Sequence, residues 1–299
     1  MTFKDYLNLL KEAGNDFMDD QGLKLSAALS YYTIFSLAPM LLIIITLLSF
    51  FFGEDAIRGE IFDQIRGLVG KQAASQLQEI LKNAQLSNKS GVAATFGAIT
   101  LLIGATGVFA EIQSSINYIW SIKVKPKKGW LRYLKTRLIS FSLIVVLGFL
   151  LMVALGVNTL VNVLSDNLAI YFSEVSVFVF YTLNNLLVFS VTTTLFAVIF
   201  KVLPDGKLRW VECFVGAGFT SILFSIGKFL ISFYIGRSDL GATYGASASI
   251  IILLLWVYYS SIILYFGAEF TKVYANSDGV HIVPTNNAVL FQKREIAKD

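Results

Sequence analysis

The sequence predicts an all-α membrane protein, a polytopic bundle in which six helices cross the bilayer. Hydrophobic residues make up 56% of the 299 residues and charged residues only 15%, and a soluble domain of that composition could not cover its surface with polar groups. Six apolar segments reach the length of about 20 residues that a helix needs to cross a hydrocarbon core. Their continuous apolar runs exclude barrel strands, in which apolar and polar residues alternate. The predicted spans are Leu25–Phe52, Val92–Trp120, Leu138–Val163, Val175–Leu203, Val211–Gly236 and Ala246–Val273.

The charges of the connecting segments predict the orientation of this bundle. Seven basic residues and no acidic residue lie between Trp120 and Leu138, which is typical of a cytoplasmic loop. The loop over 201–209 and both terminal segments are also basic, whereas the loop over 166–174 has no basic residue. We therefore predict that both termini are cytoplasmic. The net charge of +4 is explained by these loops and by anionic lipid headgroups, without a nucleic-acid partner.

Three segments flank or interrupt the predicted membrane domain, which covers residues 25–273. Residues 1–24 contain apolar positions at helical spacing and predict an amphipathic helix on the cytoplasmic surface. Residues 53–90, between the first two spans, predict an extracytoplasmic amphipathic helix pair that caps the bundle, lies in the outer interface or contacts a partner. Residues 274–299 lose periodicity and gain charge, which predicts a flexible cytoplasmic tail.

Ionisable side chains inside the predicted spans are the first candidates for a function, because a charge in the bilayer is costly. Glu111 lies about 13 Å from the inner end of the second span, at about 1.5 Å per residue. Gly104 and Gly107 share its helical face, where small residues admit another helix or leave a cavity beside the carboxylate. Glu269 lies close to the inner end of the sixth span, where it reaches the headgroups or pairs with basic residues.

Lys228 lies in the fifth span on a continuous stripe of small and polar residues spaced three or four apart. A face directed at lipid would carry no such stripe, so we predict that it faces protein or water. The predicted depths of Lys228 and Glu111 differ by only about 5 Å, so the two should approach each other. They would then form a packing ion pair or line a solvated path, and the aligned stripes favour the path. The stripe consists of Gly218, Ser221, Ser225, Lys228 and Ser232.

Further candidates lie on the fourth and first spans. Asn184 and Thr192 share a face of the fourth span and are predicted to line a polar cavity in its outer half. Pro39 frees a backbone carbonyl in the first span and predicts a bend or a hinge. The predicted substrate path comprises Glu111, Lys228, Ser221, Ser225, Ser232, Asn184, Thr192 and Glu269, and the predicted hinge or packing residues are Pro39, Gly104, Gly107 and Gly218.

Four stretches of the chain are distinctive. They are SAALSYYTIFSLAPMLL (26–42), GATGVFAEIQSSINYIW (104–120), LPDGKLRW (203–210) and YGASASIIILLLWVYYSSIILYFGAEFTKVYA (244–275). In this order they resemble the YihY/BrkB family of bacterial inner-membrane proteins, over nearly the whole chain. The resemblance implies a six-helix protein of the cytoplasmic membrane with a role in the cell envelope. Members of the family have been linked to virulence and to the export of envelope lipids.

The family long carried the label "ribonuclease BN-like", which these residues do not support. Metal-dependent RNA hydrolysis needs clustered carboxylates or histidines, whereas the one histidine of the chain is His281, in the tail. No HxH, HExxH or paired-cysteine metal motif occurs, and no GxxxxGK[ST] loop. A Ser225–Lys228 dyad is the weaker enzymatic alternative. We therefore predict a protein that is not an enzyme, with no metal, no other cofactor and no nucleic-acid partner.

Two functional classes remain. The first is a transporter that moves a lipid or another envelope component, in which Lys228 holds an anionic headgroup and Glu111 carries a proton. The second is a non-transporting scaffold that acts through residues 53–90 and has a dry interior. The polar stripes favour the transporter. The expected partners are membrane lipids and a lipid or small-molecule substrate, and the small-residue face of Gly104 and Gly107 also suits a homo-oligomer.

Overall fold

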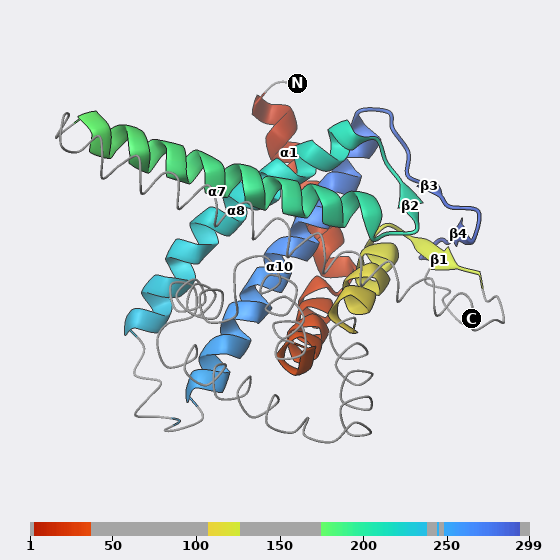
Figure 1. The fold of residues 1–299 in the computed structure, drawn as a ribbon. Helices are drawn as coiled ribbons and strands as arrows, with labels where there is room; N and C mark the ends of the chain where they lie inside the picture. The colour runs from red at the N-terminus through yellow and green to blue at the C-terminus, as the bar shows by residue number, and fades with distance from the viewer. Residues whose placement is uncertain (1–2, 37–106, 126–174, 238–243, 245–247, 294–299) are drawn as a thin grey trace, which may run out of the picture.

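The structure, a computed structural model, describes residues 3–36, 107–125, 175–237, 244 and 248–293. The described chain is mostly helical, and four short strands gather at one end of the helices (Figure 1). Three of the described helices are long and apolar enough to cross a membrane, and they coincide with the fourth, fifth and sixth predicted spans. The apolar stretches are Asn185–Val202, Trp210–Ile231 and Ile250–Ser277.

The other three predicted spans lie partly or wholly outside the described residues. The first contributes a helix over 22–36 and the second a helix over 107–119. The third span lies entirely outside the described residues, as do the outer segment 53–90 and the candidates Pro39 and Gly104. The six-span bundle and its outer cap therefore stay predictions.

Helix α1 (Phe3–Asp19) packs against the last long helix, α10 (Ala248–Ser277). Leu9, Ala13 and Phe17 recur at a spacing of four residues and are buried, so the apolar stripe of this helix faces the protein and the charged side is exposed. Leu9 and Ala13 contact α10, and Phe17 joins the central cluster. The N-terminal helix is thus an integral part of the packed structure.

Helix α8 (Trp210–Arg237) packs between α7 (Val175–Val202) and α10. Positions 216, 220 and 227 of α8 meet positions 271, 267 and 259 of α10. Because the two series run in opposite order, α8 and α10 are antiparallel. Figure 1 shows the two helices side by side along much of their length.

Two glycines bring α8 and α10 into close contact. A Cβ added at Gly216 would lie 1.9 Å from Oγ1 of Thr271, and one at Gly267 would lie 2.0 Å from Oγ1 of Thr220. Each threonine donates its hydroxyl to the carbonyl four residues earlier on its own helix, at 2.7 Å for Thr220 and 2.6 Å for Thr271, so both hydroxyls are paired at a small-residue interface. The sequence predicts Gly218 as the packing glycine of α8, but a Cβ there would meet nothing within 4 Å. Two residues turn the helix by about 200°, which places Gly218 away from this contact.

Replacing Gly267 with alanine is expected to destabilise the protein by about 1–3 kcal/mol, because the added Cβ overpacks against Thr220. The measurement is the thermal melting temperature of the purified protein in detergent. Gly218→Ala is the matched control and should leave the melting temperature unchanged or raise it, since its Cβ enters open space. Equal melting temperatures for the two variants would contradict the assigned interface.

The four strands form two antiparallel ribbons. Strand β1 (Ile122–Val124) pairs with β4 (Ala288–Leu290), and β2 (Gly206–Lys207) pairs with β3 (Val283–Pro284). In the first ribbon, the segment after α10 pairs with the segment that follows helix 107–119. In the second ribbon, it pairs with the segment that follows α7. We term this end of the molecule the ribbon end.

The segment after α10 therefore differs from the flexible tail that the sequence predicts. Helix α10 ends at Ser277 and is capped by Gly279, whose φ is 71°. The Val280 N–H donates to the carbonyl of Ala275 at 2.8 Å, as in a Schellman cap. Further along, the Thr285 N–H donates to the carbonyl of Asp205 at 2.8 Å. Strands of two or three residues show no alternation from which a sequence could reveal them.

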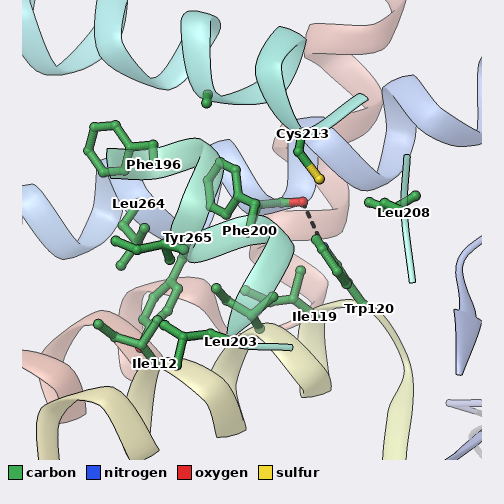
Figure 2. Close-up of a cluster of buried hydrophobic side chains, with 14 of the residues drawn as sticks. Ile112, Ile119, Trp120, Phe196, Phe200, Leu203, Leu208, Cys213, Leu264 and Tyr265 are labelled. Carbon is green, nitrogen blue, oxygen red and sulfur yellow. Dashed lines mark hydrogen bonds between the residues drawn. The ribbon is translucent and has the colours of Figure 1, made fainter. Parts of the chain in front are cut away.

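A cluster of aromatic and aliphatic side chains lies where the helices converge on the ribbon end (Figure 2). Trp120, Phe200 and Tyr265 are among its fully buried members. The indole N–H of Trp120 donates to the carbonyl of Ala268 at 3.0 Å, the dashed line in Figure 2. This hydrogen bond ties the end of helix 107–119 to α10.

Trp120→Phe is expected to lower the free energy of unfolding by about 1–3 kcal/mol, because the Ala268 carbonyl loses its indole donor and part of the indole volume is left empty. Thermal melting in detergent measures the loss. Trp210→Phe is the control, since Trp210 is 48% exposed. A melting temperature for Trp120→Phe at or above that of the control would contradict the buried role of Trp120.

Candidate functional site

Glu111 lies on helix 107–119 with its side chain half-buried. Ser115, one turn further along, donates its hydroxyl to Glu111 Oε1 at 3.3 Å. Tyr265 of α10 is fully buried, and its hydroxyl lies beside Ser115 and Glu111. Among the described residues, no lysine or arginine forms an ion pair with Glu111. We term these three residues the Glu111 site.

The surroundings of Glu111 determine what it can bind. Its close polar partners in the described part of the chain are hydroxyl groups, so the carboxyl can take up a proton or accept from a cationic or hydrogen-bonding ligand. Gly107, one turn earlier, lies against the helix over 22–36, because a Cβ there would be 3.4 Å from Ser36 Oγ. The small side chain thus admits a neighbouring helix, as the sequence predicts.

Lys228 forms no ion pair with Glu111 in the described structure. It is exposed, and the ion pairs between described residues do not include it. The side of α8 that meets α10 runs through Gly216, Thr220 and Gly227. Lys228 lies one residue further, a rotation of about 100°, which turns it out of the helix interface. The two residues therefore form no packing ion pair in the described structure, and a shared solvated path stays a prediction.

Two further polar residues of the predicted path, Ser225 and Thr192, donate their hydroxyls to carbonyls of their own helices, whereas the buried Ser221 hydroxyl has no hydrogen-bond partner among the described residues. Ser221 is buried, whereas Ser225 is exposed and donates its hydroxyl to the Ser221 carbonyl at 2.8 Å. Thr192 is half-buried and donates to the carbonyl four residues earlier at 2.7 Å. The side chains of Ser232 and Asn184 lie outside the described residues.

Glu269 belongs to a charged cluster at the ribbon end. Its Oε2 lies 2.6 Å from Lys272 Nζ, and the same ammonium lies 3.0 Å from Asp16 and 3.8 Å from Asp20. Lys293 reaches Asp20 at 2.5 Å. Glu269 is 0% exposed and Asp20 5%, so water screens their charges weakly. The pairing of Glu269 with a basic residue agrees with one of the two sequence alternatives, and it links α1, α10 and the C-terminal segment.

A cavity of about 570 Å³ opens at the ribbon end between helix 107–119, β1, the loop before β2 and Phe291. Asp205 forms part of its wall. Its Oδ2 accepts hydrogen bonds from Gln113 Nε2 at 3.1 Å and from Asn117 Nδ2 at 3.0 Å. Its backbone N–H donates to Asn117 Oδ1 at 2.8 Å. These bonds fix the carboxylate in place, and we term this space the Asp205 cavity.

A further ion pair lies at the start of α8. Arg209 Nε donates to Glu212 Oε1 at 2.8 Å, and its guanidinium lies 3.3 Å from Asp278 Oδ2. The hydrogen bond to Glu212 raises the pKa of Arg209 above its usual range. The guanidinium therefore stays charged and holds the start of α8 to the segment after α10.

Four residues of these sites were not predicted from the sequence. Asp205 and Asn117 lie 88 positions apart and look like ordinary loop and helix-end residues. Tyr265 lies in an apolar run, where an aromatic side chain predicts only packing. Lys272 resembles a lysine that snorkels from a helix end to the headgroups, although its spacing of three from Glu269 was a usable signal.

Comparison with known proteins gives the family. The family model described as "Virulence factor BrkB" matches residues 13–289. The chain belongs to the BrkB family. This confirms the resemblance carried by the four sequence stretches, and together with the three long apolar helices it shows that this BrkB-family chain is an integral membrane protein.

Relatives of this BrkB-family chain occur in Vibrio vulnificus and Bacillus subtilis. It is 26% identical over 266 residues to a UPF0761 membrane protein of Vibrio vulnificus strain YJ016, which covers 87% of this chain and 80% of the relative. It is also 26% identical over 271 residues to the Bacillus subtilis strain 168 protein named "Putative ribonuclease-like protein YfkH". This match covers 88% of this chain and 94% of the relative. No solved structure matches the chain.

Proposed function

We propose that this BrkB-family protein moves a lipid or another envelope component across the bacterial inner membrane, along a polar path that passes the Glu111 site. The observation that carries the proposal is a half-buried Glu111 carboxyl that, within the described chain, accepts a hydrogen bond from Ser115 and forms no ion pair with a lysine or arginine. An unpaired ionisable group inside a membrane protein is costly, and such groups are kept where they bind a substrate, an ion or a proton.

We further propose that the chain crosses the membrane six times and that the ribbon end faces the cytoplasm. Basic residues of two inter-helix segments, Lys123 and Lys207 among them, lie at the ribbon end together with Lys293 of the C-terminal segment. The positive-inside rule assigns such an end to the cytoplasm. In this orientation the Asp205 cavity lies at the cytoplasmic mouth of the path. Glu111 lies about 12 Å from the end of helix 107–119, at about 1.5 Å per residue, and its neighbour Ala110 lines the cavity.

The exposed polar side chains of α8 form a surface that binds lipid headgroups. Ser225 and Lys228 face away from α10, next to exposed apolar residues such as Ile226 and Phe229. A lysine in such surroundings attracts an anionic phosphate headgroup at the lipid boundary. Further proposed members of the polar path are Ser221, Ser232, Asn184, Thr192 and Glu269.

The test is translocation of a headgroup-labelled phospholipid in proteoliposomes, read with a membrane-impermeant quencher. The proposal expects the quenched fraction to rise beyond the outer-leaflet share in proportion to the protein per vesicle. Vesicles without protein, and vesicles with the unfolded protein, serve as controls. If folded protein leaves the quenched fraction at the control level with and without a proton gradient, movement of these lipids is contradicted.

A further inference from the structure

The Asp205 cavity carries side chains of both charge signs. Asp205 and Lys123 line the same space, with Gln113 and Asn117 on the side of the aspartate. Its volume of about 570 Å³ falls within the range of about 300–1,000 Å³ typical of small-molecule sites. A ligand that satisfies both charges would itself be a zwitterion with separated ammonium and anionic groups.

The aspartate side is built to receive a hydrogen-bond donor. Both amide donors, from Gln113 and Asn117, bond to Oδ2 of Asp205. An ionised carboxylate has about four acceptor positions, so Oδ1 keeps acceptor capacity within the part of the chain that the structure describes. Backbone bonds from Asp205 to Asn117 and from Thr285 hold the residue from two further directions, so little reorganisation is needed on binding.

The cavity also has a basic lining residue. Lys123 is exposed on β1 and lines the space. Lys293 lies 4.4 Å from the ring centroid of the lining residue Tyr118, and also pairs with Asp20. The Lys123 ammonium in the lining favours a phosphate, which a lysine binds as a point charge. The apolar wall, which includes Ile122 and Phe291, suits the carbon chain that joins or carries the two charged groups.

From this arrangement we propose that the Asp205 cavity binds an ethanolamine phosphate group, with its primary ammonium at Asp205 and its phosphate toward Lys123. The group reaches the cavity as the headgroup of a phospholipid or as free phosphoethanolamine. The lipid source rests on the proposed function, because it needs the ribbon end to lie at the level of inner-leaflet headgroups. In that case the cavity is where transport takes its substrate from the inner leaflet.

The binding experiment uses the purified full-length protein in detergent, titrated calorimetrically with free phosphoethanolamine. Phosphocholine and glycerol phosphate are the comparison ligands: the first has an ammonium that cannot donate a hydrogen bond, and the second has none. Both should bind at least tenfold more weakly. Asp205→Asn and Lys123→Gln should each weaken binding of phosphoethanolamine at least tenfold, whereas Lys207→Gln, an exposed lysine outside the cavity, should not. Lys123→Gln keeps the test valid if Asp205→Asn does not fold.

A second arm separates the two sources. Protein in nanodiscs of phosphatidylcholine receives phosphatidylethanolamine, and native mass spectrometry counts the retained lipid for wild type and Lys123→Gln. Selective retention of the ethanolamine lipid supports the lipid source, and binding of the free compound alone supports the soluble source. Equal binding of all three soluble ligands together with unselective lipid retention would overturn the proposal. Loss of selectivity with intact translocation refutes this site alone, and selective binding without translocation refutes the proposed function alone.

Discussion

Lys272→Ala is expected to lower the free energy of unfolding by about 3–5 kcal/mol, because it leaves the buried Glu269 carboxylate without its cation. Lys272 Nζ lies 2.6 Å from Glu269 and within 4 Å of both Asp16 and Asp20, and its side chain is only 14% exposed. Thermal melting and resistance to denaturing detergent measure the loss. Lys207→Ala, the removal of an exposed lysine, is the matched control and should fall close to wild type.

A second variant tests whether the loss of stability comes from an unpaired buried charge. In Lys272→Met combined with Glu269→Gln, neither partner of the buried pair carries a charge, so most of the lost stability should return. Recovery would show that the cost in Lys272→Ala comes from an unpaired buried charge rather than from lost packing. A double variant that is less stable than Lys272→Ala would contradict the assigned pairing.

Glu111→Gln is expected to reduce phospholipid translocation by about tenfold or more, because a charge-assisted hydrogen bond contributes about 1.5–3 kcal/mol. The amide keeps the shape of the side chain and can still accept from Ser115, but it cannot carry a negative charge or take up a proton. The melting temperature should therefore stay close to that of wild type. Proteoliposome assays at equal protein content provide the comparison.

The matched control for Glu111 is Glu12→Gln, which removes an exposed carboxylate from α1. This variant should translocate lipid at the wild-type rate, since Glu12 lies outside the proposed path. Translocation by folded Glu111→Gln at the rate of Glu12→Gln would remove Glu111 from the mechanism. It would leave the carboxyl as a packing residue.

Composition and spacing predicted the parts of this protein that are periodic over many residues. The three long apolar helices follow from runs of apolar residues, and the buried stripe of α1 follows from Leu9, Ala13 and Phe17 at helical spacing. The pairing of Glu269 was foreseeable because a buried carboxylate needs a cation and Lys272 lies three residues away.

The parts that could not be predicted depend on how a helix is rotated about its axis and on pairing between residues far apart in the sequence. Helix α8 carries two neighbouring small or polar stripes, one through Gly216, Thr220 and Gly227 and one through Ser225 and Lys228. Composition does not show which of the two meets α10. A rotation of about 100° decides whether Lys228 points inward or outward. The ribbons and the hydrogen bonds of Asp205 join residues far apart in the chain, for which a single sequence carries no local signal.

The most direct measurement of a path at Glu111 is the water accessibility of Ser115. Ser115→Cys, in a Cys213→Ala background that removes the one native cysteine, is reacted in proteoliposomes with a small, charged, membrane-impermeant thiol reagent. Ser114→Cys is the reference, because Ser114 is exposed and lines the Asp205 cavity, whereas Ser115 is 2% exposed and contacts Glu111. The account predicts that position 115 reacts and that its modification stops translocation. Reaction at position 114 alone, with position 115 inert in a translocating protein, would contradict a path past Glu111.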